Sequence, residues 1–209
     1  MNIQLALDRM KIADAIQLSR EVEQHIDWIE VGTSLIKEFG MTSVRKIKEA
    51  FPNKTIVADI KTIDNARYEF ELCFQAGADV ATVMGVSPLV TIEACMDVAK
   101  QYNKKVMIDL LNTSDEQKSA LMRCKDAFLC DHVSKDQQEE SGERNLGTRR
   151  EDPTIQLAVA GGITFDSIGT LIETLNPDVV IIGSAISKAQ NPSEAAAKFK
   201  QLISQTRGE

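Results

Sequence analysis

Val57-Ala58-Asp59-Ile60-Lys61-Thr62-Ile63-Asp64-Asn65-Ala66 is the stretch that decides the fold, because an apolar run ends there in charged residues and leads directly into a helical segment. The apolar run itself, residues 55–58, is typical of a buried strand. Alternate side chains of a strand share a face, so we expect Asp59 and Lys61 to project to the same side. A structural alternative makes these two residues a strand-end ion pair and Asp64 merely the N-cap of the next helix. The rest of the chain bears on this choice because it repeats the pattern.

The strand-then-helix pattern occurs along the whole chain. Short apolar runs predict strands at residues 3–7, 28–32, 55–58, 79–84, 106–109, 127–130, 155–160 and 179–182. Helical spacing of apolar residues predicts helices at 12–22, 35–50, 65–75, 88–102, 114–123, 164–175 and 193–204, the second of them interrupted near Phe39-Gly40. Segment 137–153 is polar and has no apolar stripe, so we expect the outer layer to be thin or mobile there. An aspartate also precedes four of the apolar runs, at Asp27, Asp79, Asp126 and Asp178, which indicates one βα unit used many times.

Eight apolar strands that alternate with helices predict an α/β fold, a parallel sheet closed into a (β/α)₈ TIM barrel. An open doubly wound sheet is the alternative. The barrel is favoured because polar residues end several different strands, and these ends converge at one face of a barrel but scatter along the edge of an open sheet. The length of 209 residues and the hydrophobic content of 43% suit one domain, residues 1–209. The strand-end residues are Asp8, Glu30, Asp59 with Lys61, Asp109 and His132.

Composition argues against several classes of partner and location. The net charge of −7 and the lack of a long basic cluster argue against a nucleic-acid surface. The sequence starts with no basic region followed by an apolar core, and nowhere do eighteen apolar residues run together, so we expect no membrane association and a cytoplasmic location. The four cysteines form no Cys-x-x-Cys pair and the histidines do not cluster, which argues against a zinc site.

Glu30 and Asp59 would lie at the tips of neighbouring strands, where two carboxylates together with water and substrate hydroxyls can hold Mg²⁺. Lys61 beside them would add a second positive charge. Such a group stabilises an enediolate, the negative oxygen pair that forms when a sugar ketone loses a proton or a carboxylate next to its carbonyl. Lys61 could instead form a Schiff base, but a lysine flanked by carboxylates stays protonated and is a poor nucleophile. The electrostatic role is therefore favoured.

Two further features concern proton transfer and phosphate. His132 follows the sixth strand, and near neutral pH histidine is the natural proton carrier, although a lone histidine can also be structural. Gly161-Gly162 and Gly183-Ser184 follow the seventh and eighth strands, whose loops in barrels commonly bind phosphate through backbone N–H groups. Glycine is suited to this role because a side chain would keep the phosphate away from those amides. The sequence therefore predicts a phosphorylated small substrate.

These motifs together resemble the orotidine-monophosphate decarboxylase superfamily. Within it the chain is similar to the branch that holds 3-hexulose-6-phosphate synthase and 3-keto-L-gulonate-6-phosphate decarboxylase. The similarity covers nearly the whole length, and the Asp-x-Lys-x-x-Asp motif is specific to the superfamily. The matching motifs are Ala6-Leu7-Asp8, Ile29-Glu30-Val31-Gly32, Asp59-x-Lys61-x-x-Asp64, His132, Ala160-Gly161-Gly162 and Gly183-Ser184-Ala185-Ile186.

The resemblance implies a role for each matched residue and a homodimer in which Asp64 reaches into the partner's active site. The implied roles are Mg²⁺ ligands for Glu30 and Asp59, substrate binding and catalysis for Asp8, Lys61 and Asp64, and general acid/base catalysis for His132. We also count Asp59 among the catalytic residues, and we expect substrate contacts from Glu30, Asp109, Gly161, Gly162, Gly183 and Ser184.

The two activities of the branch differ in their motifs. The decarboxylases have arginine directly after the glycine of strand eight and Glu-Leu-Thr-Gly at strand five, whereas this chain has Ser184 and Asp109-Leu110-Leu111-Asn112, which resemble the synthase. The expected reaction is the Mg²⁺-dependent addition of formaldehyde to D-ribulose 5-phosphate. A decarboxylase that makes the same enediolate by losing CO₂, and a non-catalytic sugar-phosphate-binding barrel with a sensing role, are the alternatives.

Overall fold

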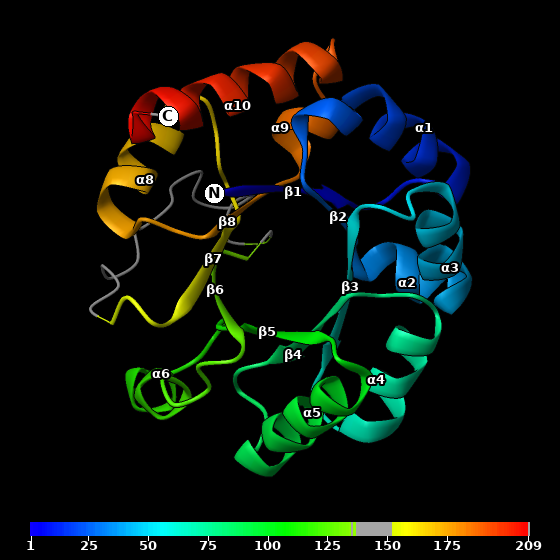
Figure 1. The fold of residues 1–209 in the computed structure, drawn as a ribbon, viewed down its shortest axis with the longest axis vertical. Helices are drawn as coiled ribbons and strands as arrows, with labels where there is room; N and C mark the ends of the chain where they lie inside the picture. The colour runs from blue at the N-terminus through cyan, green and yellow to red at the C-terminus, as the bar shows by residue number, and fades with distance from the viewer. Residues whose placement is uncertain (135, 137–151, 209) are drawn as a thin grey trace.

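The structure, a computed structural model, describes residues 1–134, 136 and 152–208. Eight strands pair in parallel and in chain order, and β8 pairs with β1 to close a barrel. Figure 1 shows these strands as an inner ring with the helices outside it. The predicted (β/α)₈ barrel is confirmed, and the open sheet is excluded. The strands are β1 (Asn2–Leu7), β2 (Trp28–Val31), β3 (Thr55–Thr62), β4 (Val80–Met84), β5 (Lys105–Asp109), β6 (Phe128–His132), β7 (Gln156–Ala160) and β8 (Val179–Ile182).

The helices largely follow the predicted spacing. The predicted interruption near Phe39-Gly40 is confirmed: two helices occupy this segment, because Gly40 between them has a φ of +59° that breaks the helical path. The short helix after β8 was not predicted, and residues 137–151 of the polar segment lie outside the described residues. The helices are α1 (Ile12–Val22), α2 (Thr33–Phe39), α3 (Met41–Ala50), α4 (Ala66–Gln75), α5 (Leu89–Tyr102), α6 (Asp115–Leu121), α8 (Ile168–Leu175), α9 (Ser184–Ser187) and α10 (Pro192–Arg207), with a 3₁₀ helix, η1 (Glu23–His25).

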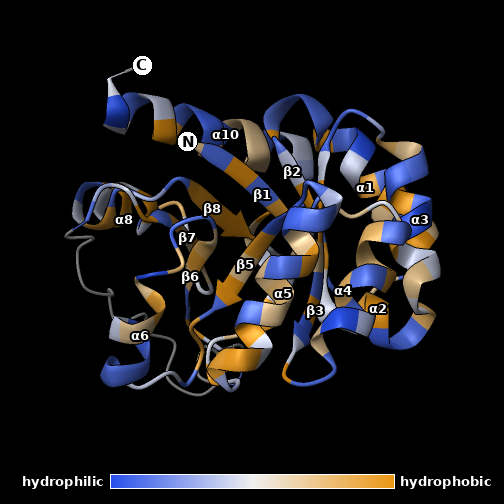
Figure 2. Ribbon diagram, turned by 60° about the horizontal axis from the view of Figure 1, so that its bottom comes forward, coloured by the Kyte–Doolittle hydropathy of each residue, from blue (hydrophilic) through white to orange (hydrophobic). Residues whose placement is uncertain are grey.

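The strands are buried on both faces, as the side chains of β5 illustrate. Val106 and Ile108 pack outward into the large cluster between sheet and helices, whereas Met107 belongs to a smaller apolar cluster inside the barrel. Figure 2 shows β5 and β8 as predominantly hydrophobic, while helices such as α5 also carry hydrophilic residues. Each fully buried aliphatic side chain contributes about 1.5–3 kcal/mol to the stability of the fold. The two apolar clusters therefore stabilise the barrel without the polar residues at the ends of its strands.

Three of the four repeated aspartates hold neighbouring strands together at the amino end of the barrel. The Oδ2 atom of Asp79 accepts a hydrogen bond of 2.9 Å from the N–H of Ile56, and the N–H of Asp79 donates to the Ile56 carbonyl at 2.7 Å. Asp27 and Asp178 make the same pair of bonds to residues of β1 and β7, with carboxylate bonds of 2.8 Å in both. Asp126 is exposed, and within the described residues it makes no such bond. The repeat noticed in the sequence is therefore a strand-pairing device.

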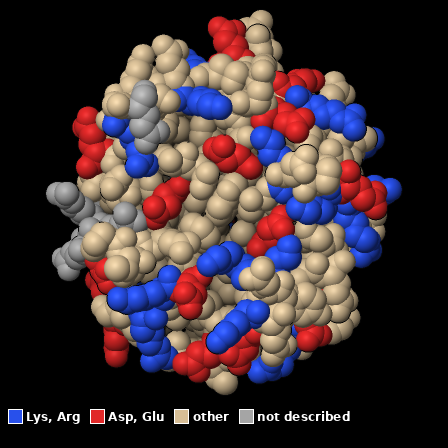
Figure 3. All heavy atoms as spheres, viewed as in Figure 1, with Lys and Arg blue, Asp and Glu red and all other residues tan. Residues whose placement is uncertain are grey.

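The surface carries mixed charges and a few large apolar side chains. On the face seen in Figure 3, basic and acidic side chains are interspersed. Exposed apolar side chains include Ile63, Tyr68, Val90 and Met122. Of the helices in the part of the chain that the structure describes, none combines the length and the apolar character needed to span a bilayer.

Candidate active site

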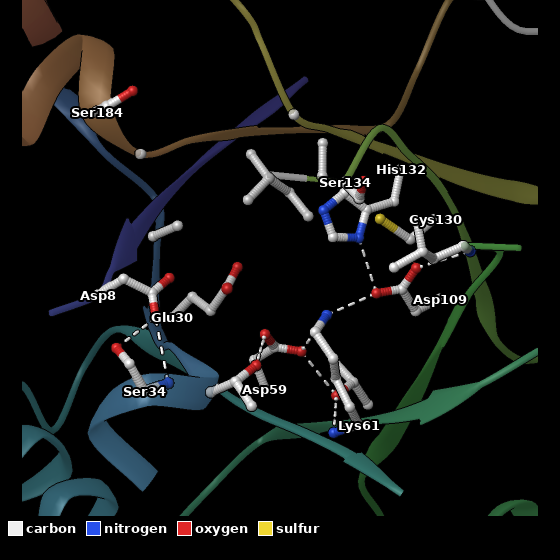
Figure 4. Close-up of a pocket in the computed structure, with 18 of the residues that line it drawn as sticks. Asp8, Glu30, Ser34, Asp59, Lys61, Asp109, Cys130, His132, Ser134 and Ser184 are labelled. Carbon is white, nitrogen blue, oxygen red and sulfur yellow. Dashed lines mark hydrogen bonds and ion pairs between the residues drawn. The ribbon is translucent and has the colours of Figure 1, made fainter. Parts of the chain in front are cut away.

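A cavity of about 650 Å³ opens at the carboxyl ends of the strands. Its walls are made by the last residues of several strands and the loops that follow them, as the barrel predicts. Figure 4 shows the acidic residues, the lysine and the histidine pointing into this cavity from different strands. The convergence expected from the sequence is therefore confirmed. The predicted residues that line the cavity are Asp8, Glu30, Asp59, Lys61, Asp109, His132, Gly161, Gly162, Gly183 and Ser184.

Asp109 links the lysine and the histidine. One of its oxygens, Oδ2, lies 2.6 Å from Lys61 Nζ and 2.8 Å from His132 Nδ1. Its other oxygen, Oδ1, accepts a hydrogen bond of 3.0 Å from the N–H of Leu111. Burial alone would raise the pKa of the Asp109 carboxyl, but the bonds to His132 and Lys61 outweigh burial and hold this pKa well below its usual range. The carboxylate stays ionised, so His132 Nδ1 must donate to it, and Nε2 is the ring nitrogen available for proton transfer.

Lys61 lies between two carboxylates. Its Nζ contacts Asp59 Oδ1 at 3.2 Å as well as Asp109. Burial would lower the pKa of this ammonium group, but Asp59, Asp109 and then Glu30 raise it above its usual value. A lysine that keeps its proton cannot act as an amine nucleophile, which supports the electrostatic role over a Schiff base. The ion pair of the structural alternative exists, but it lies inside the cavity and not on a solvated strand end.

The backbone at Lys61 departs from a regular strand. Lys61 has a φ of +52°, in the left-handed region that side-chain-bearing residues rarely occupy. The pairing of β3 with β4 also shifts register between Ala58 and Thr62. Such a conformation costs about 1–3 kcal/mol and persists only where neighbouring contacts enforce it. Simple alternation predicted correctly that Asp59 and Lys61 line the same cavity, but it did not predict the register shift or the left-handed backbone of Lys61.

Two threonines that the sequence reasoning missed hold Asp59. The hydroxyl of Thr33 donates to Asp59 Oδ2 at 2.6 Å, and the hydroxyl of Thr82 donates to Oδ1 at 2.9 Å. Thr82 stands between Val80 and Met84 at an inward position of β4, so an isolated hydroxyl in an apolar strand was the available signal. Thr33 directly follows Gly32 at the start of α2 and carried no distinct signal.

Glu30 is buried, and within the described residues it forms no salt bridge. The amide Nε2 of Gln4, another residue that sequence reasoning missed, donates to Glu30 Oε2, and Gln4 Oε1 has no partner among the described residues. Burial, then the negative charges of Asp59 and Asp8, raise the pKa of Glu30 well above its usual value, against the opposite effect of Lys61. The nearby charge of Lys61 therefore does not offset the burial of the Glu30 carboxyl and the negative charges around it.

The donor set fits a divalent cation held by two carboxylates. In the described residues no group of three or more His, Cys, Asp or Glu side chains is arranged to hold a metal. Glu30 and Asp59 nevertheless line one cavity from neighbouring strands, and a cation between them would offset both the burial and the repulsion by Asp59 that raise the pKa of Glu30. Two carboxylates completed by water and substrate oxygens suit Mg²⁺, which keeps part of its hydration shell.

Asp8 is fixed by the start of α2. Its Oδ1 accepts bonds of 2.6 Å and 3.2 Å from the hydroxyl and the N–H of Ser34. A Cβ atom on Gly32 would lie only 2.4 Å from the carbonyl oxygen of Leu7 and 2.6 Å from the Asp8 carboxyl. Gly32 is therefore required for the close approach that places Asp8 at the cavity.

The glycine loops line the same cavity as Lys61. Gly161 and Gly162 have φ values of +89° and +63°, a conformation that glycine adopts at little cost. Gly183 precedes the four-residue helix α9, which begins at Ser184. Figure 4 places Ser184 on the side of the cavity opposite Lys61. These loops therefore contribute the glycine-rich part of the cavity wall.

Asp64 is the predicted site residue that does not reach this cavity. It is exposed and does not line the cavity of its own chain. The N-cap of α4 is Asn65, with a φ of +56°, so the alternative that made Asp64 the cap is wrong.

Cys130 lines the cavity floor with Met107 and is buried. Burial and the nearby Asp109 raise the pKa of its thiol well above the usual value. The thiol is neutral and behaves as a small apolar group, not as a nucleophile.

Known proteins resemble this chain over nearly its full length. The model of the orotidine 5'-phosphate decarboxylase / HUMPS family matches residues 1–199. The 3-hexulose-6-phosphate synthase of Bacillus subtilis (strain 168) is 38% identical over 212 residues, which cover 98% of this chain and 100% of the relative.

Solved structures agree with this assignment. The 3-hexulose-6-phosphate synthase from Salmonella typhimurium superposes with a TM-score of 0.91 at 35% identity, over 99% of this chain and 100% of that one. The 3-keto-L-gulonate-6-phosphate decarboxylase from Vibrio cholerae superposes with a TM-score of 0.86 at 28% identity, over 98% of both chains. The chain belongs to the orotidine 5'-phosphate decarboxylase / HUMPS family, and it is an enzyme of that family.

Proposed function

We propose that the chain is a lyase that acts on a sugar phosphate and, within that class, a 3-hexulose-6-phosphate synthase. The observation that carries the proposal is the Asp109 carboxylate, which binds Lys61 Nζ and His132 Nδ1 through one oxygen. This contact puts a permanent cation beside a proton carrier, as the removal of a proton next to a ketone requires. The names of the Bacillus subtilis and Salmonella typhimurium relatives, and Ser184 where decarboxylases have arginine, favour the synthase.

In the proposed reaction, His132 Nε2 removes a proton from C1 of D-ribulose 5-phosphate, and the electron pair of the broken C–H bond forms an enediolate. The Lys61 ammonium stabilises its negative oxygens. C1 then bonds to the carbon of formaldehyde, and the electron pair released from the C=O double bond moves to the formaldehyde oxygen. That oxygen takes the proton back from His132, which gives D-arabino-hex-3-ulose 6-phosphate and regenerates the histidine.

Glu30 and Asp59 are the residues that would hold Mg²⁺. The ion would supply a second positive charge for the enediolate oxygens, beside that of Lys61. The support for this part of the proposal is that burial, and then the nearby charges of Asp59 and Asp8, raise the pKa of Glu30. Thr33 and Thr82 would keep Asp59 in place whether or not a cation is bound.

The phosphate would bind at the loops after β7 and β8. Gly161, Gly162, Gly183 and Ser184 line the cavity, and Ser184 lies on the side opposite Lys61, so a five-carbon sugar phosphate would lie with its phosphate at these loops and its reacting C1 toward Lys61. Both named relatives with solved structures carry a sugar 6-phosphate in their names, which supports a phosphorylated sugar substrate.

A homodimer with shared sites is part of the proposal. Asp64 is exposed at the end of the β3 loop, and its neighbour Ile63 exposes 56% of its surface, although it is a large apolar residue. A second copy seated here would cover Ile63 and bring Asp64 to the partner's cavity. Mixing Lys61→Ala subunits with Asp64→Ala subunits tests this. Each heterodimer would have one intact site out of two, so after random mixing about a quarter of all sites should be active. No recovery from a mixture proven to exchange subunits would contradict shared sites.

The decisive assay measures two reactions side by side. Purified protein with Mg²⁺ is given D-ribulose 5-phosphate and formaldehyde, with formaldehyde loss as the readout, and separately 3-keto-L-gulonate 6-phosphate, with CO₂ release as the readout. Efficient formaldehyde consumption alone is expected. CO₂ release alone would assign the decarboxylase, for which the Vibrio cholerae structure is the supporting observation. Turnover of neither substrate would favour a binding role.

A further inference from the structure

The buried hydroxyl of Thr82 on β4 makes two hydrogen bonds that meet at the catalytic machinery. Thr82 Oγ1 accepts a bond of 2.8 Å from the backbone N–H of Lys61 and donates a bond of 2.9 Å to Asp59 Oδ1. The residue exposes only 4% of its surface, so water competes little for either bond.

The bond to Lys61 takes the place of a backbone hydrogen bond between β3 and β4. Ala58 pairs with Ala81 and Thr62 pairs with Val83, so β3 carries extra residues opposite β4 at this point. A bulged residue loses its regular ladder partner, and a buried N–H without any acceptor is strongly unfavourable. The Thr82 side chain supplies that acceptor, and it does so where Lys61 has the φ of +52°.

The two bonds fix the direction of the hydroxyl. A hydroxyl has one hydrogen, and because the Lys61 N–H already donates to this oxygen, the Thr82 hydrogen is free to point at Asp59. Asp59 Oδ1 also receives Lys61 Nζ at 3.2 Å. The contacts therefore close a ring that runs from the Lys61 backbone through Thr82 and Asp59 to the ammonium group of the same lysine.

We propose that Thr82 is a positioning residue for this reaction: its hydroxyl holds the left-handed backbone of Lys61 and the Asp59 carboxylate in one arrangement, so that the ammonium group reaches Asp109. The inference rests on the proposed lyase function. Thr82 acts through Lys61 and Asp59 and needs no contact with the substrate. The loops that would bind phosphate, after β7 and β8, have no part in the ring.

Thr33 provides a matched contrast. Its hydroxyl donates to Asp59 Oδ2 at 2.6 Å, and this bond leaves the Lys61 backbone untouched. Thr33→Val should therefore disturb Asp59 alone, whereas Thr82→Val should disturb Asp59 and Lys61 together. Thr42 on α3 is exposed and does not line the cavity, so Thr42→Val controls for the effect of replacing threonine by valine as such.

The test compares Thr82→Val, which keeps the shape and removes the hydroxyl, with Thr82→Ser, which keeps the hydroxyl. In Thr82→Val we expect kcat to fall by about 10–100-fold while KM for the sugar phosphate changes by less than about threefold, since misplacement of a catalytic group affects turnover more than binding. Thr82→Ser should return to within about threefold of the wild-type kcat. Thr33→Val should lose less than Thr82→Val, and Thr42→Val nothing.

Amide hydrogen exchange gives a readout that does not depend on activity. The Lys61 amide should exchange at least about tenfold faster in Thr82→Val and normally in Thr82→Ser and Thr33→Val. Wild-type kcat in a folded Thr82→Val protein, or an equal loss in Thr82→Ser, would overturn the proposal. If the wild-type protein turns over neither sugar phosphate, the proposed function fails, but the exchange rate of Lys61 still decides whether Thr82 positions it.

Discussion

Aspartates stand at both ends of the barrel, but their partners differ. At the amino end, Asp79 accepts from a backbone N–H and from Lys48 and Lys104, at 2.8 Å and 2.6 Å, so its charge is fully compensated. At the carboxyl end, the acids face one another across a cavity, and Lys61 is shared between Asp59 and Asp109. An aspartate therefore stabilises the fold where lysines and a backbone N–H neutralise its charge, as at Asp79. Where several carboxylates share one lysine, as around Lys61, aspartates form a candidate reactive site.

The pKa values express the same contrast. Burial would raise the pKa of Asp79, yet Lys104, Lys48 and the Ile56 N–H lower it below its usual value. Burial and like charges raise the pKa of Glu30. Ionised Asp79 therefore favours folding, whereas ionised Glu30 opposes it, and a protein keeps such an unfavourable group where it serves a function.

The largest expected effect is a loss of turnover, and it should distinguish two lysines that each form an ion pair with aspartate. Lys61→Ala should reduce turnover by about 10³-fold or more, because it would remove the cation that we propose stabilises the enediolate. Lys104→Ala, at the other end, should keep the wild-type turnover and lose about 1 kcal/mol of unfolding free energy, since its side chain is partly exposed. Steady-state kinetics and urea unfolding on both variants measure this. Full activity in Lys61→Ala would contradict the mechanism.

The next effect tests the strand-pairing aspartates. Asp79→Asn should lower the unfolding free energy by about 1–3 kcal/mol, because it weakens charge-assisted bonds to two lysines and to the backbone of β3. The matched control is Asp126→Asn, which should change stability by less than about 0.5 kcal/mol because Asp126 is exposed. Equal losses in both variants, measured by urea unfolding, would remove the proposed difference between these positions.

The stabilisation that Asp79 provides depends on pH in a defined way. The folded pKa of Asp79 is depressed, so its contribution is present above the unfolded value of about 3.9 and is lost as pH falls toward the folded pKa. The stability difference between wild type and Asp79→Asn should therefore be constant at neutral pH and shrink below about pH 4. Unfolding titrations between neutral and acidic pH follow it. A difference that grows on acidification would mean that folding raises the pKa of Asp79 instead of lowering it.

The smallest change in stability is expected for Glu30→Gln. This variant should be more stable than the wild type, whereas Asp79→Asn should be less stable. Glu30→Gln removes a buried charge that Asp59 and Asp8 disfavour, so without Mg²⁺ the variant should unfold at a slightly higher temperature than the wild type. With Mg²⁺ the wild type should gain stability and the variant should gain less. Thermal unfolding with and without Mg²⁺ measures both. A Mg²⁺ response as large in Glu30→Gln as in the wild type would argue against Glu30 as a ligand.

The sequence predicted the elements of the barrel and most of the site because both depend on local patterns. Apolar runs define strands, and a polar residue at the end of a run must lie at the carboxyl face once the barrel closes. Asp8, Asp109 and His132 were placed correctly by this rule alone. The repeat of aspartates was also visible, but its cause was not, since it depends on which N–H group each carboxylate meets in a neighbouring strand.

The features that the sequence did not reveal depend on contacts between distant segments. Thr82 bonds to Lys61 and Asp59 only because β3 bulges, and no local pattern predicts that register shift. Gln4 was read as part of an apolar strand, although it faces Glu30. The direction of Asp64 depends on a second chain in the proposed dimer, which is beyond what the pattern of one chain can specify.

The strand-pairing aspartates also suggest an order of events during folding. Each bond closes a short stretch of chain, with its two residues separated by 24, 23 and 21 positions for Asp27, Asp79 and Asp178. Closing such short loops costs little chain entropy, so the β1–β2, β3–β4 and β7–β8 units can form independently and early. The pairing of β1 with β8 joins the two ends of the chain, and we expect this contact, which completes the cavity and its machinery, to form last.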